Sequence, residues 1–224
     1  MDKLTEYYSK RVKEMENYYE SIYHRDEPVR QGEQRDITKA IKKYFSGRKV
    51  LEIACGTGYW TTFLSEVAKS IVAIDSSEAV LTSAKSKSYK CKITFRKGNA
   101  YKLPFTEGEF DGGLANFWFS HIPKSKIKSF LNNFHRVLKD KAIVFMCDNI
   151  YNEGVGGKLI NGRKGDNNTY KIRTLEDDKE YKILKNYYSE KQIVDILGKN
   201  VSIVDIYFGK CFWYVCYEVR KKLG

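Results

Sequence analysis

The 224-residue sequence has few features of secreted, metal-binding or membrane-spanning proteins. Its five cysteines are an odd number without a C-x-x-C pair, which argues against a disulfide framework and a zinc site. Apolar runs such as Ala142 to Cys147 are far too short to cross a bilayer, and the N-terminus is charged. We therefore expect a soluble, cytoplasmic protein without a metal, in one domain whose 42% hydrophobic residues can fill a core.

Positive charge exceeds negative charge, with 40 Lys and Arg against 28 Asp and Glu and a net charge of +12. Such a surface favours anionic partners. The basic residues are spread along the chain, however, and form no dense basic-aromatic block of the kind that binds RNA. We therefore do not expect a nucleic acid as partner.

The most informative segment runs from Val50 to Trp60 and reads V-L-E-I-A-C-G-T-G-Y-W. It predicts a buried strand that enters a turn at Gly56-x-Gly58 and continues as a helix. Because glycine has no Cβ, such a turn lets a nucleotide-like ligand approach the backbone. Glu52 lies inside the strand, where a carboxylate needs a donor to pair with.

Three kinds of ligand loop share this pattern. A dinucleotide fingerprint would have a small third residue where Thr61 stands, so that match is incomplete. The nearest imitation of a phosphate-binding loop, Gly154 to Lys158, is followed by Leu159 instead of Ser or Thr, so that match fails. The third kind is the loop that binds a nucleoside joined to an amino acid.

Two downstream segments favour the third kind. Asp75 lies 17 residues beyond Gly58, at the tip of the next predicted strand, where an acid can accept hydrogen bonds from both ribose hydroxyls. The segment Gly98 to Phe105 reads G-N-A-Y-K-L-P-F and is followed by Phe110-Asp111.

From Lys49 to about Asp148, these segments resemble the class I S-adenosylmethionine (SAM)-dependent methyltransferases of the small-molecule, ubiquinone/menaquinone-methyltransferase-like type. Ala54 stands at the first glycine of their loop, and Asn99 replaces the acid that binds the adenine amino group. The resemblance implies SAM as cofactor and S-adenosylhomocysteine (SAH) as product, with Glu52 near the amino-acid end of the cofactor, directly or through water. The expected cofactor site is Glu52, Ala54, Gly56, Gly58, Trp60, Asp75, Ser76, Asn99, Ala100, Asn116 and Phe117.

Hydrophobic periodicity predicts an α/β fold in which strands and helices alternate. The resemblance implies a Rossmann-like, seven-stranded, mostly parallel sheet with helices on both faces and one antiparallel C-terminal strand. We expect an N-terminal helical lid (1–46), a SAM-binding core (47–148), a loop and hairpin insertion (149–188), and a C-terminal helix and strands (189–224). In the lid, one amphipathic helix should fill the first two dozen residues and end by Pro28, and a second should begin near Arg30.

The segment after the fourth core strand bears on the chemistry. Asn116-Phe-Trp-Phe119 lacks the prolines that base-modifying N-methyltransferases carry there, and no Pro-Cys nucleophile stands in their place. His121 is the one histidine at the catalytic end of a strand, and it is our candidate general base. A plain loop residue is the alternative, and a carboxylate acceptor would need no base.

We therefore predict methyl transfer to an oxygen or nitrogen of a small-molecule acceptor. Arginines could bind an anionic acceptor through charge-assisted hydrogen bonds. Candidate acceptor contacts are Tyr18, Tyr23, Trp118, Arg163, Tyr170 and Arg173. Two alternatives stay open: an RNA or protein methyltransferase, and a SAM-binding protein without turnover.

Overall fold

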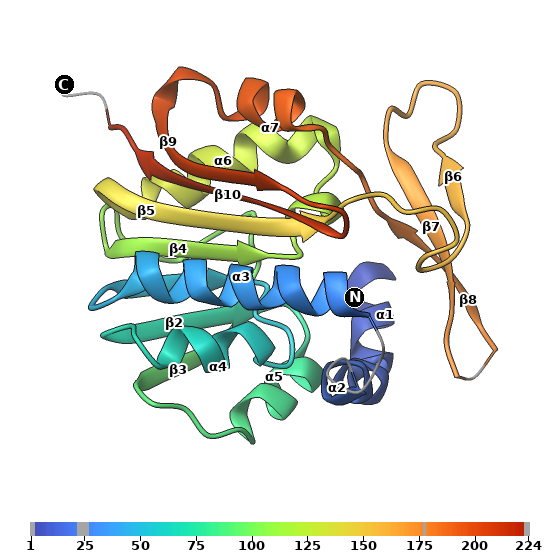
Figure 1. Ribbon diagram of the computed structural model, residues 1–224, viewed down its shortest axis with the longest axis horizontal. Helices are drawn as coiled ribbons and strands as arrows, with labels where there is room; N and C mark the ends of the chain where they lie inside the picture. The colour runs from blue at the N-terminus through green and yellow to red at the C-terminus, as the bar shows by residue number, and fades with distance from the viewer. Residues whose placement is uncertain (1–2, 22–26, 177, 222–224) are drawn as a thin grey trace.

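The computed structural model describes residues 3–21, 27–176 and 178–221. Its central sheet has seven strands in the order β3-β2-β1-β4-β5-β10-β9 (Figure 1). All run parallel except β10, which is antiparallel to both of its neighbours, as predicted. The strand bounds are β1 (Lys49–Ile53), β2 (Ser70–Asp75), β3 (Lys92–Lys97), β4 (Phe110–Asn116), β5 (Leu138–Asn149), β9 (Val201–Phe208) and β10 (Phe212–Val219).

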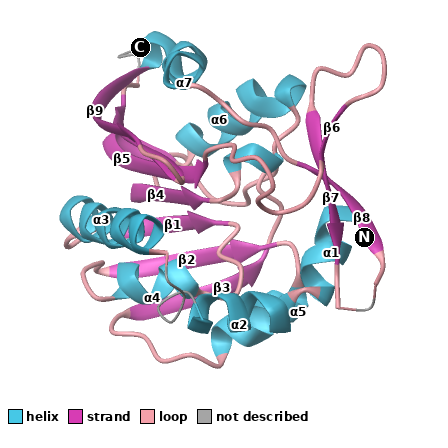
Figure 2. Cartoon of the chain, turned by 45° about the vertical axis from the view of Figure 1, so that its right-hand side comes forward, coloured by secondary structure: helices cyan, strands magenta, loops and turns pink. Residues whose placement is uncertain are grey.

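Helices cover both faces of this sheet, because alternate residues of its strands point to opposite sides (Figures 1 and 2). In β5, Val144 and Met146 face one core, whereas Ile143, Phe145 and Cys147 face the other. The first core includes α6 (Ile127–Arg136) and α7 (Glu190–Leu197), and the second includes α3 (Pro28–Phe45), α4 (Tyr59–Ser65) and α5 (Glu78–Lys85). Three short 3-10 turns complete these layers: η1 (Phe119–His121), η2 (Lys124–Lys126) and η3 (Gly198–Asn200).

The N-terminal helices begin and end at other residues than the sequence predicted. The single helix expected there is two helices, α1 (Lys3–Lys10) and α2 (Val12–Ser21), which meet at Arg11. Pro28 lies in the first turn of α3, where its missing N–H costs no hydrogen bond. The second predicted helix therefore begins at this proline.

The insertion forms a second sheet, with strands in the order β6-β7-β8. The predicted hairpin is β7 (Thr169–Thr174) and β8 (Glu180–Leu184), and β6 (Leu159–Asn161) adds a short third strand that the sequence did not indicate. This small sheet and α1 lie beyond the carboxyl ends of β1 and β4 (Figure 2). Tyr7 of α1 packs there with Leu175 and Ile183. In the described part of the chain, no helix is long and apolar enough to cross a membrane.

The order of strands reverses between β1 and β4, which are neighbours in the sheet although β2 and β3 separate them in sequence. In doubly wound sheets, ligands bind at the carboxyl ends of the strands at such a point. The N-terminal helices and the small sheet therefore enclose the edge where a ligand is expected.

Candidate active site

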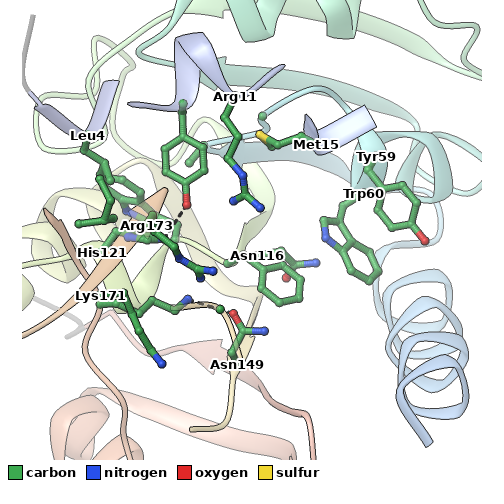
Figure 3. Close-up of a pocket in the computed structure, with 18 of the residues that line it drawn as sticks. Leu4, Arg11, Met15, Tyr59, Trp60, Asn116, His121, Asn149, Lys171 and Arg173 are labelled. Atoms are coloured by element: carbon green, nitrogen blue, oxygen red, sulfur yellow. Dashed lines mark hydrogen bonds between the residues drawn. The ribbon is translucent and has the colours of Figure 1, made fainter. Parts of the chain in front are cut away.

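A cavity of about 410 Å³ lies at this edge of the sheet. Its floor comes from the segments that follow β1, β2 and β4, and its roof from the N-terminal helices. The small sheet supplies the remaining wall. Figure 3 shows side chains from all three parts directed toward one central space. Members include Leu4, Tyr8, Arg11 and Met15 of the roof, Ala54, Gly56, Trp60, Asp75, Ser76, Asn116, Phe117 and Trp118 of the floor, and Lys171, Arg173 and Lys185 of the wall.

Asp75 holds the glycine loop in place. One carboxylate oxygen accepts a hydrogen bond from the Gly56 N–H (3.0 Å), and the other accepts one from the Ser77 N–H (2.9 Å). Burial raises the pKa of Asp75, and these backbone donors oppose that shift. Asp75 thus ties the end of β2 to the loop after β1, with its carboxylate at the cavity.

The two loop glycines have different tasks. Gly56 has φ 57° and lines the cavity, where an added Cβ would lie 3.5 Å from Met15 Cε of the roof. Gly58 has φ 82° and is directed away from the cavity, because an added Cβ would collide with the hydroxyl of Tyr89. Gly58 therefore serves packing, whereas the sequence indicated ligand approach for both.

Two residues of the floor have strained backbones. Ala54 and Phe117 have φ of 53° and 54°, a region that costs non-glycine residues on the order of 1 kcal/mol each. The Phe117 ring stacks on Trp60 with 5.7 Å between centroids. Such strain persists where the surrounding structure enforces it, and it is typical of ligand sites.

Glu52 does not line the cavity. Its carboxyl group is buried in β1, where it accepts a hydrogen bond from Thr61 Oγ1 (2.8 Å). Burial raises the pKa of Glu52 to about 8, although the bond from Thr61 opposes this shift. The sequence placed this acid beside the cofactor, but alternation along β1 directs it into the structure below the loop.

Several side chains that line the cavity have buried polar atoms without a hydrogen-bond partner in the described part of the chain, among them Gln34, Trp60, Asn116 and Trp118. These atoms are Gln34 Oε1, Trp60 Nε1, Trp118 Nε1, and both Nδ2 and Oδ1 of Asn116. A buried donor or acceptor left unpaired costs about 1–3 kcal/mol. Because these atoms have almost no accessible surface, a ligand with donors and acceptors would satisfy them only after the side chains turned toward the cavity.

The wall from the small sheet is cationic. Lys171 and Arg173 are alternate residues of β7, so their side chains leave the same face of the strand. Lys171 is 1% exposed, and its ammonium donates to the carbonyls of Val155 (3.1 Å) and Gly157 (2.8 Å). Burial lowers the pKa of Lys171, and the charge of Arg173 lowers it further. Within the described residues, neither cation forms an ion pair with a carboxylate.

His121 lies in the cavity wall with both ring nitrogens engaged. Nδ1 faces the Leu184 carbonyl at 2.7 Å and must carry the proton, so Nε2 accepts from the Tyr8 hydroxyl at 2.9 Å (Figure 3). Burial lowers the pKa of His121 far below its usual value, and Lys185 adds to the effect. The imidazole is therefore neutral and tied to the roof helix α1.

A buried network behind His121 was not indicated by the sequence. Lys185 donates to Ser120 Oγ (2.7 Å), Asp148 Oδ1 (2.8 Å) and Asn149 Oδ1 (3.0 Å), which uses all three of its N–H groups. Burial alone would raise the pKa of Asp148, but Lys185 outweighs it and the pKa is lowered. The one sequence signal was Asp148, an acid at the end of an apolar strand.

Several expected site residues lie outside the cavity. Asn99 and Ala100 follow β3 at the same sheet edge, but Asn99 is exposed and its Oδ1 accepts from the Tyr101 N–H (2.8 Å). Tyr170 donates to Asp166 (2.6 Å), and Arg163 is exposed in the loop before β7.

Of the two lid tyrosines, Tyr18 belongs to α2 but its side chain is not described, and Tyr23 lies outside the described residues. No group of three or more His, Cys, Asp or Glu side chains in the described ranges could hold a metal ion.

Comparison with known proteins finds similarity to methyltransferases over part of the chain. Residues 50–141 match the family model described as a methyltransferase domain. The demethylmenaquinone methyltransferase of Lactococcus lactis is 32% identical over 146 residues, which cover 61% of this chain and 57% of the relative. An uncharacterized methyltransferase of Synechocystis is 33% identical over 102 residues, which cover 46% and 47%. The chain spans about half the length of these curated relatives.

Solved structures resemble nearly the whole chain. The complex of DhpI with SAH has a TM-score of 0.75 at 21% identity and covers 98% of this chain and 97% of DhpI. The PH0226 protein of Pyrococcus horikoshii has a TM-score of 0.71 at 20% identity and covers 92% and 99%. Residues 50–141 thus match a methyltransferase domain, and the whole chain has the fold of the DhpI structure solved with SAH, in agreement with the resemblance in the sequence.

Proposed function

We propose that this chain is a methyltransferase that uses SAM to methylate a small anionic molecule inside the cavity. One observation carries the proposal: the cavity joins a polar floor suited to a nucleoside-amino-acid cofactor to a cationic wall suited to an anion.

Unpaired groups of residues at the floor and of Gln34 suit the cofactor, provided that their side chains turn toward it on binding. Asn116 Nδ2 and Trp60 Nε1 can donate to a carboxylate, and Asn116 Oδ1 and Gln34 Oε1 can accept from an ammonium group. Asp75 and the backbone at Gly56 are suited to the ribose side. When bound, SAM supplies an electrophilic methyl group on a sulfonium.

The chain itself contributes positioning and exclusion of water. The roof is joined to the floor where Thr5 and Ser76 share a hydrogen bond (2.8 Å) and Ser9 and Ser77 share another (2.7 Å). A cavity of about 410 Å³ is in the range that binds small ligands. A cavity of this size can hold a small acceptor whole, but only one side chain or nucleotide of a protein or an RNA, which favours a small acceptor.

We assign His121 a positioning role in place of the general base that the sequence suggested. Its Nε2 lone pair is used by Tyr8, and its burial opposes protonation. His121 thus holds α1 over the cavity through Tyr8.

The test follows SAH formation from SAM with three fractions of a cell extract: dialysable small molecules, RNA, and protein. We expect SAH only with the small molecules. SAH formed only with RNA or protein would support the first alternative. Tight SAM binding without SAH from any fraction would support a binding protein without turnover.

A further inference from the structure

We propose that the acceptor is an oxyacid bound by Arg11, Lys171 and Arg173, and that its ionised oxygen is the methylated atom, without a general base. This inference rests on the proposed function and names its substrate class. It accounts for two observations together: unneutralised cations in the wall, and the lack of an available base.

The charges around the cavity do not balance locally. Lys185 is paired with Asp148, and Arg30 is paired with Glu27 at 2.6 Å. Lys171 and Arg173 have no carboxylate partner in the described part of the chain. A buried cation without a counterion is costly, so this wall gains stability when an anion binds.

Arg11 completes the subsite from the opposite side. It lies at the junction of α1 and α2, and its guanidinium points into the space that Arg173 also faces (Figure 3). Arg11 is ion-paired with Glu14 through Nε at 3.3 Å and lies against the ring of Tyr7, so an acid in the cavity would share its guanidinium with Glu14. Two guanidinium groups around one space suit an oxyanion, because each can donate two parallel hydrogen bonds.

The carboxylates and the histidine that line the described cavity are already engaged, so none of them is placed to remove a proton from the acceptor. The two carboxylates of the lining are Glu27, paired with Arg30, and Asp75, bonded to two backbone N–H groups. His121 has both nitrogens engaged. Burial lowers the pKa of Lys171, but its Nζ is held in place by hydrogen bonds to the carbonyls of Val155 and Gly157.

The cationic wall and the engaged side chains favour some kinds of acceptor over others. An alcohol would need a base, and an ammonium would be repelled by the cationic wall. An ionised acid oxygen already carries the electron pair that the reaction requires. The oxygen forms a bond to the methyl carbon, the carbon–sulfur bond breaks with its electron pair remaining on sulfur, and the negative and positive charges cancel. No proton moves. The product has one negative charge fewer than the acid, so the wall then binds it less tightly.

The test is calorimetric titration of protein saturated with SAH, at pH 7 and low salt, with acetate and with methylphosphonate as separate probes. The neutral esters methyl acetate and dimethyl methylphosphonate serve as matched ligands. SAH binding is measured first, so failure of the proposed function is seen separately from failure of the subsite. Arg173→Gln and Arg11→Gln remove one cation each, and Arg163→Gln is the control, because Arg163 lies in the same insertion but outside the cavity.

We expect at least one acid to bind. The Kd of its neutral ester should be higher by about tenfold or more. Arg173→Gln and Arg11→Gln should each weaken binding of that acid by about tenfold or more, with Arg163→Gln unchanged. The acid that binds more tightly distinguishes a carboxylate from a phosphonate subsite. The proposal is overturned if neither acid binds, if ester and acid bind equally, or if all three variants weaken binding alike.

A second measurement tests the methylated atom. Mass spectrometry after incubation with SAM should find the methyl ester of the acid that binds. Ethanol, incubated in the same way, serves as an alcohol probe. If its methyl ether forms and the ester of the acid does not, the direct role of the ionised oxygen is refuted.

Discussion

Replacing Glu52 with Gln should make the stability of the unliganded protein less dependent on pH. Burial raises the pKa of Glu52 to about 8 from an ordinary value of 4.5. Between these two pH values the folded protein holds a proton that the unfolded chain has released. The contribution of Glu52 to stability is therefore highest below pH 4.5, falls as the pH rises, and levels off above pH 8.

The size of this effect follows from the shift. At 1.36 kcal/mol per pH unit, the wild-type protein should lose on the order of 3 kcal/mol from this one group between pH 5 and pH 8. Gln has no such proton, and its amide oxygen can still accept the hydrogen bond from Thr61. Stability of the variant relative to wild type should therefore rise by that amount over the same range.

Urea unfolding at pH 5 and pH 8 measures both proteins, with Glu153→Gln as a control at an exposed acid. For each variant, the free energy of unfolding is compared with that of the wild type at pH 5 and again at pH 8. The result of the experiment is how much this difference changes between the two pH values. If Glu52→Gln and Glu153→Gln show the same small change, the carboxyl group is not held in its neutral form and the reasoning is refuted.

Three further substitutions test the site. Asp75→Ala should weaken SAH binding by about 1.5–3 kcal/mol in calorimetry, since a charged hydrogen-bond acceptor is lost; unchanged affinity would remove Asp75 from the site. His121→Gln should raise the Kd for SAH through loss of the Tyr8 contact and reduce kcat less than about tenfold; a fall of a hundredfold in kcat alone would restore His121 as the base. Lys185→Met should destabilise the fold by about 3–5 kcal/mol in urea unfolding because Asp148 stays buried without its partner, and the further change Asp148→Leu should recover much of that loss.

The core of the fold was predictable because its signals are local. The apolar run in β5 and the glycine loop after β1 each lie within one short segment. The break at Arg11 was hidden because the helical spacing of Leu4, Tyr8 and Met15 continues across it. Strand β6 was hidden because its three residues lie in a segment rich in glycine and asparagine, and only pairing with β7 makes it a strand.

The cavity floor was also predictable, since Asp75 and Asn116 end strands and Gly56 follows one, all at the same sheet edge. The wall was only partly predictable. Arg173 was expected, but Lys185 reaches Asp148 across 37 residues through packing of the insertion against β5. The task of Gly58 depends on Tyr89, which no local pattern connects to it.

A crystal structure of the protein with SAH tests the central claim most directly. We expect SAH in the cavity at the carboxyl ends of β1, β2 and β4, in contact with Gly56, Asp75 and Asn116, with its sulfur facing the space between Arg11 and Arg173. SAH bound elsewhere on the protein, or a cavity that holds only water at saturating SAH, would contradict the account.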